Sequence, residues 1–181
     1  MANIETYASA TPVSTDDLLG TDDPDGTPLT RNFAIQAVLG VIEFGSIYVT
    51  GGAAGQSPGA AYALLTEFAA DGDSSAGVTP TVASNKITIA NTGFYFVMAA
   101  LSFENDTAEL TSFRVYWNAV AQTQLTAIID INNTNEEYNA VLCGFVDVTT
   151  GATDLDLRAI APAGAVTVKE GSLTIVRVGN T

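Results

Sequence analysis

Residues 93–103, with the sequence GFYFVMAALSF, constrain the fold more than any other part of the chain. They carry no charge, and both alternating sets of side chains along an extended strand are apolar. A strand with only one buried face normally shows polar residues on the other face. The glycine at its start, the turn signal at 104–106 and the β-rich surroundings favour a strand over a buried helix. We therefore predict a strand covered by a second sheet on one side and by another subunit on the other.

About eight strands are predicted in all, at short and fairly regular spacing, and residues 138–148 form a second strand that is apolar on both faces. Ile87 and Ile89 are expected to point inward, and Trp117 shares its face with Phe113 and Val115, so we expect it in the core rather than stacked on a sugar. The other predicted strands cover 61–68, 85–91, 113–117, 124–131, 154–158 and 172–178. This pattern predicts an all-β sandwich or jelly roll, and two strands with apolar outer faces predict a closed oligomer.

The chain is expected to divide into three parts. Residues 1–43 carry seven acids and one base and predict a hairpin around 22–26 followed by a short helix over 33–42. This unit is too small to hold a core alone, so it should dock on another surface. Residues 44–60, rich in Gly and Ala, predict a linker with a short strand, and residues 61–181 predict the main domain.

The charge balance restricts the partners of the protein. Six Lys and Arg against twenty Asp and Glu give a formal charge of −14, and the bases are scattered along the sequence. Such a chain repels phosphate backbones and anionic lipid, so we expect neither nucleic acid nor a membrane as a partner. The N-terminus shows no secretory signal, which predicts synthesis in a reducing cytoplasm. Cys143 is the single cysteine and is predicted to be a small buried side chain.

No catalytic constellation is predicted. The chain contains no histidine, which excludes Ser-His-Asp and Cys-His sites and a histidine zinc site. The acidic turn at 22–26 lacks the first ligand and the bidentate Glu of a calcium loop, so a solvated turn is predicted there. The carboxylate pairs Asp154/Asp156 and Glu136/Glu137 are predicted to be solvated. We therefore expect no enzyme activity, no catalytic residue, no metal and no cofactor.

Two short motifs in the main domain carry a family resemblance. The start of the central strand, Gly93-x-Tyr95-x-Val97, resembles the Gly-x-Tyr-x-Phe strand of the C1q/TNF-like family, with Val97 where Phe is usual. The closing GSLTIVRVG is similar to the final strand of many such domains. The resemblance implies a ten-stranded jelly-roll sandwich that forms a tight trimer.

The N-terminal part resembles a different group of proteins. The segment TPVSTDDLLGTDDPDGTPLTRNFAIQAVLGVI looks like the start of tailed-bacteriophage structural proteins, in which a hairpin precedes a short helix. Such proteins include head fibres, capsid decoration (cement) proteins and some tail fibres. They join an N-terminal attachment segment to a C-terminal trimeric knob.

Together these observations predict a homotrimeric virion protein on the outer capsid surface, made in the host bacterial cytoplasm. Its partner would be the major capsid protein or a tail component. The predicted capsid-anchoring residues are Leu18, Leu19, Phe33, Ile35, Val38 and Leu39. The predicted trimer-interface residues are Tyr95, Val97, Leu101, Phe103, Leu142, Val146 and Val148. A tail-fibre tip that recognises a host glycan and a carbohydrate-active enzyme are the alternatives.

Overall fold

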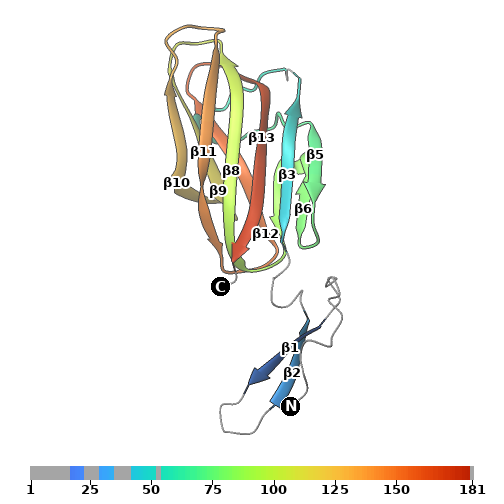
Figure 1. The fold of residues 1–181 in the computed structure, drawn as a ribbon. Coiled ribbons are helices and arrows are strands. Elements are labelled where there is room, and N and C mark those ends of the chain that lie inside the picture. Colours follow the sequence, from blue (N-terminus) through green and yellow to red (C-terminus); the bar gives the residue numbers. More distant parts are fainter. Residues whose placement is uncertain (1–16, 23–28, 35–41, 52–53, 180–181) are drawn as a thin grey trace. The chain divides into compact units, whose positions relative to one another are not determined.

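A computed structural model describes residues 17–22, 29–34, 42–51 and 54–179 (Figure 1). The chain divides into two units, Met1–Val41 and Ile42–Thr181. Within the described residues the structure is all-β apart from a single 3-10 turn at Val82–Ser84. No helix in this part of the chain is long and apolar enough to span a membrane.

The first unit contains an antiparallel hairpin of β1 (Asp17–Asp22) and β2 (Leu29–Ala34). This confirms the two short strands that the sequence predicted. Phe33 and Ala34, the first residues of the helix expected over 33–42, belong instead to the hairpin ladder, opposite Leu18 and Asp17. Residues 35–41, and residues 23–28 of the acidic turn, lie outside the described part of the chain.

The second unit is a sandwich of two antiparallel sheets (Figure 1). The five-stranded sheet has the order β11 (Glu137–Val148), β8 (Gly93–Asn105), β13 (Val166–Gly179), β3 (Phe44–Thr50) and β5 (Ala70–Ser74). The six-stranded sheet has the order β10 (Val120–Asp130), β9 (Leu110–Trp117), β12 (Thr153–Ala161), β7 (Lys86–Ile89) and β6 (Val78–Thr81), and β4 (Gly59–Leu64) also pairs with β12. The central strand predicted at 93–103 is therefore β8, and it lies between β11 and β13.

Residues 44–50 belong to the sandwich rather than to a linker. Strand β3 is hydrogen-bonded between β13 and β5, and its side chains Ile47 and Val49 are buried in the core. The pairing partner β13 lies near the other end of the chain, so the composition around 44–60 gave no sign of it. The second unit accordingly begins at Ile42, before the predicted main domain.

The core lies between the two sheets, and buried residues alternate with more exposed ones along β3, β7 and β8. Ile87 and Ile89 point inward as predicted, while Trp117 is half-buried and packs against the core. The rings of Phe103 on β8 and Phe113 on β9 meet edge to face, with centroids 4.8 Å apart. Such aromatic contacts across the layer fix which face of each strand is inside.

A buried polar cluster holds the first residues of the sandwich unit. The side chain of Glu43 is almost fully buried and accepts hydrogen bonds from Arg177 Nη1 (2.6 Å), Tyr95 Oη (2.7 Å) and Asn91 Nδ2 (2.9 Å). Burial, and then the bond to Glu43, raises the pKa of the Tyr95 hydroxyl, so it remains a donor at neutral pH. Three donors meet the hydrogen-bonding needs of the buried Glu43 carboxylate. These bonds fix the position of the chain where β3 begins.

Candidate subunit interface

The seven side chains predicted to form the trimer interface lie instead in the core of a single chain. Each of the seven is at most 3% exposed. They are Tyr95, Val97, Leu101, Phe103, Leu142, Val146 and Val148. The prediction chose the wrong parity, because both parities of β8 are apolar and only the opposing sheet decides between them. These side chains are not available to another subunit.

The opposite parity of the same strands forms an exposed apolar face on the five-stranded sheet. The strand register places Phe145 (β11), Phe96 (β8), Val176 (β13) and Phe44 (β3) in one row across four strands. Phe145 is 60% exposed, and its ring lies edge-on to Phe96 with centroids 5.5 Å apart. We call this surface the apolar face; its further members are Phe94, Met98 and Val141.

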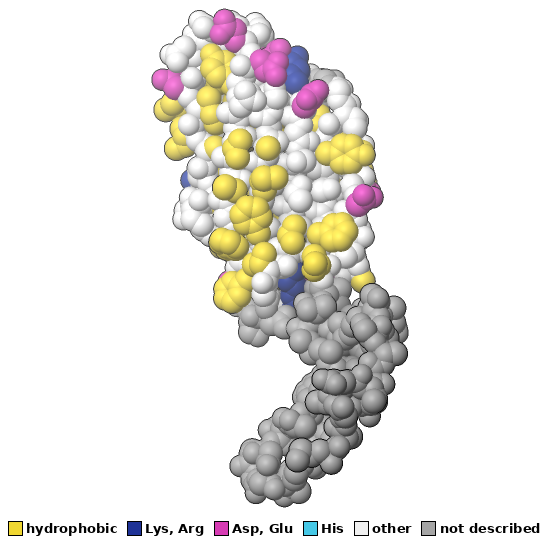
Figure 2. All heavy atoms as spheres, in the orientation of Figure 1, with side chains coloured by type: hydrophobic (Ala, Val, Ile, Leu, Met, Phe, Trp, Pro, Cys, Tyr) yellow, Lys and Arg dark blue, Asp and Glu magenta, His cyan; other side chains and the backbone are white. Residues whose placement is uncertain are grey.

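The apolar face becomes polar toward one end of the sheet. The next rows contain Met98 beside Thr174, then Val141 opposite Ala100. At the far end, Glu104 lies opposite Glu137 and forms an ion pair with Lys169 (2.8 Å). Figure 2 shows hydrophobic side chains gathered over this face and acidic side chains at its upper end.

A signal for the correct parity was present in the sequence. On β11 the outward set begins with Glu137 and Asn139 and ends with Asp147, whereas the inward set is uncharged from Tyr138 to Val148. A face that carries charge at its strand ends reaches solvent there, so it is the outer face. The interface prediction considered the apolar residues at the centre of each strand and did not consider the charged residues at its ends.

Cys143 is exposed, contrary to the buried position predicted for it. It shares the outward parity of β11 with Val141 and Phe145 and lies opposite Met98 on β8. Its apolar neighbours in the sequence suggested a core, but they belong to both faces of the strand. The thiol therefore lies within the apolar face.

A hollow of about 470 Å³ continues the apolar face around the edge of the sandwich. It opens beside β10 and β11, which are the edge strands of their two sheets. Phe94 and Phe145 line it from the five-stranded sheet, and Trp117 and Val120 line it from the six-stranded sheet. The apolar surface thus extends over a face and an adjoining edge.

Three of the predicted anchoring residues lie in the hairpin. Leu18 of β1 pairs with Phe33 of β2, and Leu19 pairs with Asn32. Ile35, Val38 and Leu39 lie outside the described residues.

The carboxylates considered for catalysis are engaged in other contacts. Asp154 pairs with Lys86 (2.5 Å) and Asp156 with Arg158 (2.7 Å) on the outer face of the six-stranded sheet. Burial alone would raise the pKa of Asp154, but hydrogen bonds from Lys86 and Thr88 outweigh it and lower the pKa. A glycosidase acid needs a raised pKa, so Asp154 is poorly suited to that role. Within the described residues no three His, Cys, Asp or Glu side chains come together as a metal site.

Comparison with known proteins identifies the fold. Neither a family model nor a curated protein sequence matches the chain. Among solved structures, Eiger TNF from S. frugiperda has a TM-score of 0.56 at 12% identity, covering 77% of this chain and 95% of its own. The globular domain of zebrafish complement 1qA protein has a TM-score of 0.56 at 13% identity, covering 77% of this chain and 99% of its own.

A phage protein shares the same architecture. The PRD1 vertex protein P5 has a TM-score of 0.53 at 13% identity, and the match covers 99% of this chain and 91% of that one. Identities this low show a common fold alone. The chain is thus an all-β, two-sheet sandwich of the C1q/TNF-like jelly-roll type, as the two short motifs indicated.

Proposed function

We propose that this protein is a homotrimeric structural component of a tailed-bacteriophage virion, a capsid decoration (cement) or head-fibre protein on the outer capsid surface. The apolar face carries this proposal, because a row of Phe44, Phe96, Phe145 and Val176 crosses four strands without a charge. Contiguous apolar surface of this kind on a soluble domain marks an interaction site.

The geometry of the apolar surface favours a closed ring of identical copies. In a cyclic trimer each subunit presents two different patches, one to each neighbour. The apolar face supplies one such patch, and the side of the β10–β11 hollow formed by Trp117 and Val120 of the other sheet supplies the second. C1q/TNF-like proteins are typically homotrimers, which supports a threefold assembly.

The phage neighbour supports a virion location. The TNF and complement structures each cover 77% of this chain, close to the extent of the sandwich unit, whereas the vertex protein P5 covers 99%. The vertex protein therefore matches a length of chain that includes the hairpin unit. A formal charge of −14 per copy also keeps such a protein away from packaged DNA and in solution.

The hairpin unit is the proposed capsid anchor. A two-stranded hairpin is marginally stable alone, so β1 and β2 gain stability by docking on a partner such as the major capsid protein. Three copies held by one trimer would bind together, and the effective concentration would convert weak single contacts into firm attachment. Leu18, Leu19 and Phe33 are the proposed anchoring residues that lie in the described strands of this unit.

Deletion of residues 1–41 tests both halves of the proposal. Because the sandwich unit begins at Ile42, the truncated protein should fold and remain a trimer by light scattering. It should no longer sediment with purified capsids, whereas the full chain should. Binding of the truncated protein to capsids at full strength would refute the anchoring role, and binding of the full chain to purified tails instead would place it on the tail.

A further inference from the structure

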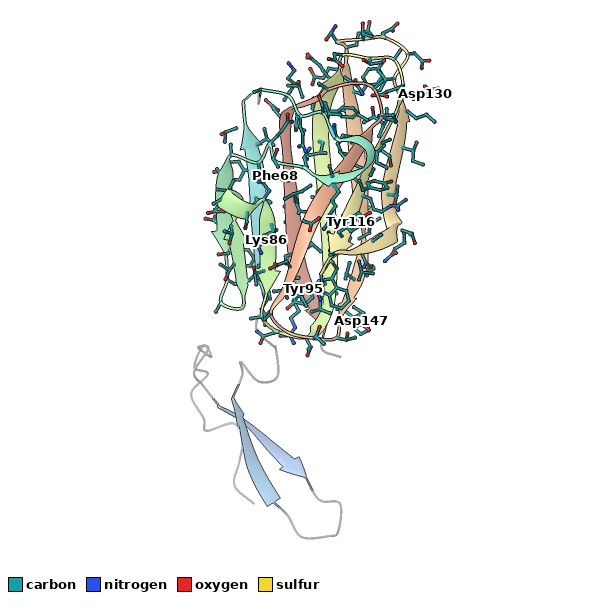
Figure 3. The ribbon with its side chains drawn as sticks, turned by 180° about the vertical axis from the view of Figure 1, so that it is seen from behind. Phe68, Lys86, Tyr95, Tyr116, Asp130 and Asp147 are labelled. Carbon is teal, nitrogen blue, oxygen red and sulfur yellow. The ribbon has the colours of Figure 1, made fainter. Side chains whose placement is uncertain are left out.

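The outer face of the six-stranded sheet gathers half of the bases of a strongly acidic protein, and Asp154 and Asp156 on the same face pair with two of them. It carries Lys86, Arg114 and Arg158, three of the six bases in the whole sequence. This face lies on the opposite side of the sandwich from the apolar face, and it meets the β10–β11 hollow at Asn118. Figure 3, seen from behind, shows Lys86 and Tyr116 on this sheet.

Arg114 of β9 and Arg158 of β12 are direct cross-strand partners. Like charges in this position destabilise a sheet unless something compensates them. Arg158 is compensated, since its Nε and Nη2 donate to the two carboxylate oxygens of Asp156 at 2.7 and 3.2 Å. Arg114 donates from Nε to Thr126 Oγ1 (2.8 Å) and takes part in none of the ion pairs of the described residues.

Two tyrosines hold both guanidinium groups in place. The Arg114 guanidinium lies 4.3 Å from the centre of the Tyr62 ring, and that of Arg158 lies 4.2 Å from the centre of the Tyr116 ring. The two rings are 5.8 Å apart, and the Tyr62 hydroxyl is hydrogen-bonded to Ser112 Oγ (2.7 Å). A guanidinium held by stacking loses little conformational entropy when it binds an anion. Arg114 and Arg158 are therefore pre-organised for anion binding.

A hollow of about 330 Å³, lined by both polar and apolar side chains, adjoins this pair. Arg158 lines it together with Lys86, Asp154 and Asn118, and Ser84 adds a hydroxyl. Asn118 is held in a left-handed backbone conformation (φ 48°) at the β9–β10 turn. Alternating ammonium, carboxylate and amide groups match the hydroxyls of a sugar ring, and the hollow lies within the size range of small-ligand sites.

We propose that this surface binds a saccharide that carries a carboxylate. The carboxylate would lie between Arg114 and Arg158, where Arg114 has guanidinium N–H groups to offer a forked pair of hydrogen bonds. The sugar hydroxyls would occupy the adjoining hollow beside Lys86, Asp154 and Asn118. The ligand carboxylate pairs with the Arg114 guanidinium, so binding should weaken as salt is added.

Calorimetry on the full-length protein tests the proposal with glucuronate, and with glucose as a probe that lacks the carboxylate. Glucuronate should bind, glucose should bind at least tenfold more weakly, and raising the salt from 20 to 200 mM should weaken glucuronate binding. Inorganic phosphate serves as a third probe. Phosphate binding as tight as glucuronate binding would show a simple anion site and overturn the proposal, as would no detectable binding of glucuronate.

Three variants locate the site. Arg114→Gln should weaken glucuronate binding at least tenfold, whereas Lys169→Gln removes the same charge from the other sheet and should change the affinity less than twofold. Ser84→Ala removes a hydroxyl that lines the hollow of the proposed site but not the β10–β11 hollow, and it should weaken binding several-fold. Equal effects of Arg114→Gln and Lys169→Gln in folded proteins would show that only net charge matters, and would refute the assigned site.

Discussion

Replacing Phe145 by Ser should dissociate the trimer without unfolding the subunit. The ring is 60% exposed in the single chain, and full burial of a Phe side chain contributes about 1.5–3 kcal/mol. Covering the exposed part therefore contributes about 1–2 kcal/mol per copy, or roughly 3–5 kcal/mol for the three copies in a trimer. The equilibrium constant for dissociation should rise by roughly a hundredfold to a few thousandfold, because about 1.4 kcal/mol corresponds to a factor of ten.

The adjacent residue provides the matched control. Val146 points inward and is 2% exposed, so Val146→Ser should reduce the unfolding free energy of the subunit by about 2–4 kcal/mol while leaving the apolar face intact. Sedimentation velocity over a concentration series measures dissociation, and circular dichroism in denaturant measures folding. The reasoning is refuted if Phe145→Ser sediments as the wild type does, or if the wild type is monomeric at micromolar concentration.

Three further predictions concern individual side chains. Cys143 should react with a maleimide in the monomeric Phe145→Ser variant and be protected in the wild-type trimer; equal rates would remove the thiol from the interface. Burial raises the pKa of the Glu67 carboxyl despite the hydrogen bond from the Val168 amide. The folded state therefore favours the protonated carboxyl more than the unfolded state does. The unfolding free energy should fall as the pH rises above the ordinary carboxyl pKa of 4.5. Glu67→Gln should flatten that decline in denaturant titrations, and an unchanged pH profile would contradict the assignment. Arg177→Met should cost about 3–5 kcal/mol in unfolding experiments, because it leaves Glu43 buried without its cation, and a loss below 1 kcal/mol would show that the other donors suffice.

The central strand, β8, shows what the local sequence pattern can predict and what it cannot. Its start and its two apolar faces follow from residues 93–103 alone, because strand period is a local property, whereas the strand runs on to Asn105, through the turn predicted at 104–106. The choice between the Tyr95 parity and the Phe96 parity is not local. It depends on which set contacts Phe113 and Leu155 on the opposite sheet, and those residues are brought there by the topology.

The same distinction separates the other correct and incorrect predictions. The sequence by itself determined the all-β class, the hairpin of β1 and β2, the inward positions of Ile87 and Ile89 and the absence of histidine chemistry. Only the tertiary structure brought Glu43 to Arg177, placed β3 inside the sheet, exposed Cys143 and set Arg114 opposite Arg158. The physical reason is that a side chain's burial and partners depend on strands distant in sequence, whereas its strand and its alternation depend on the residues beside it.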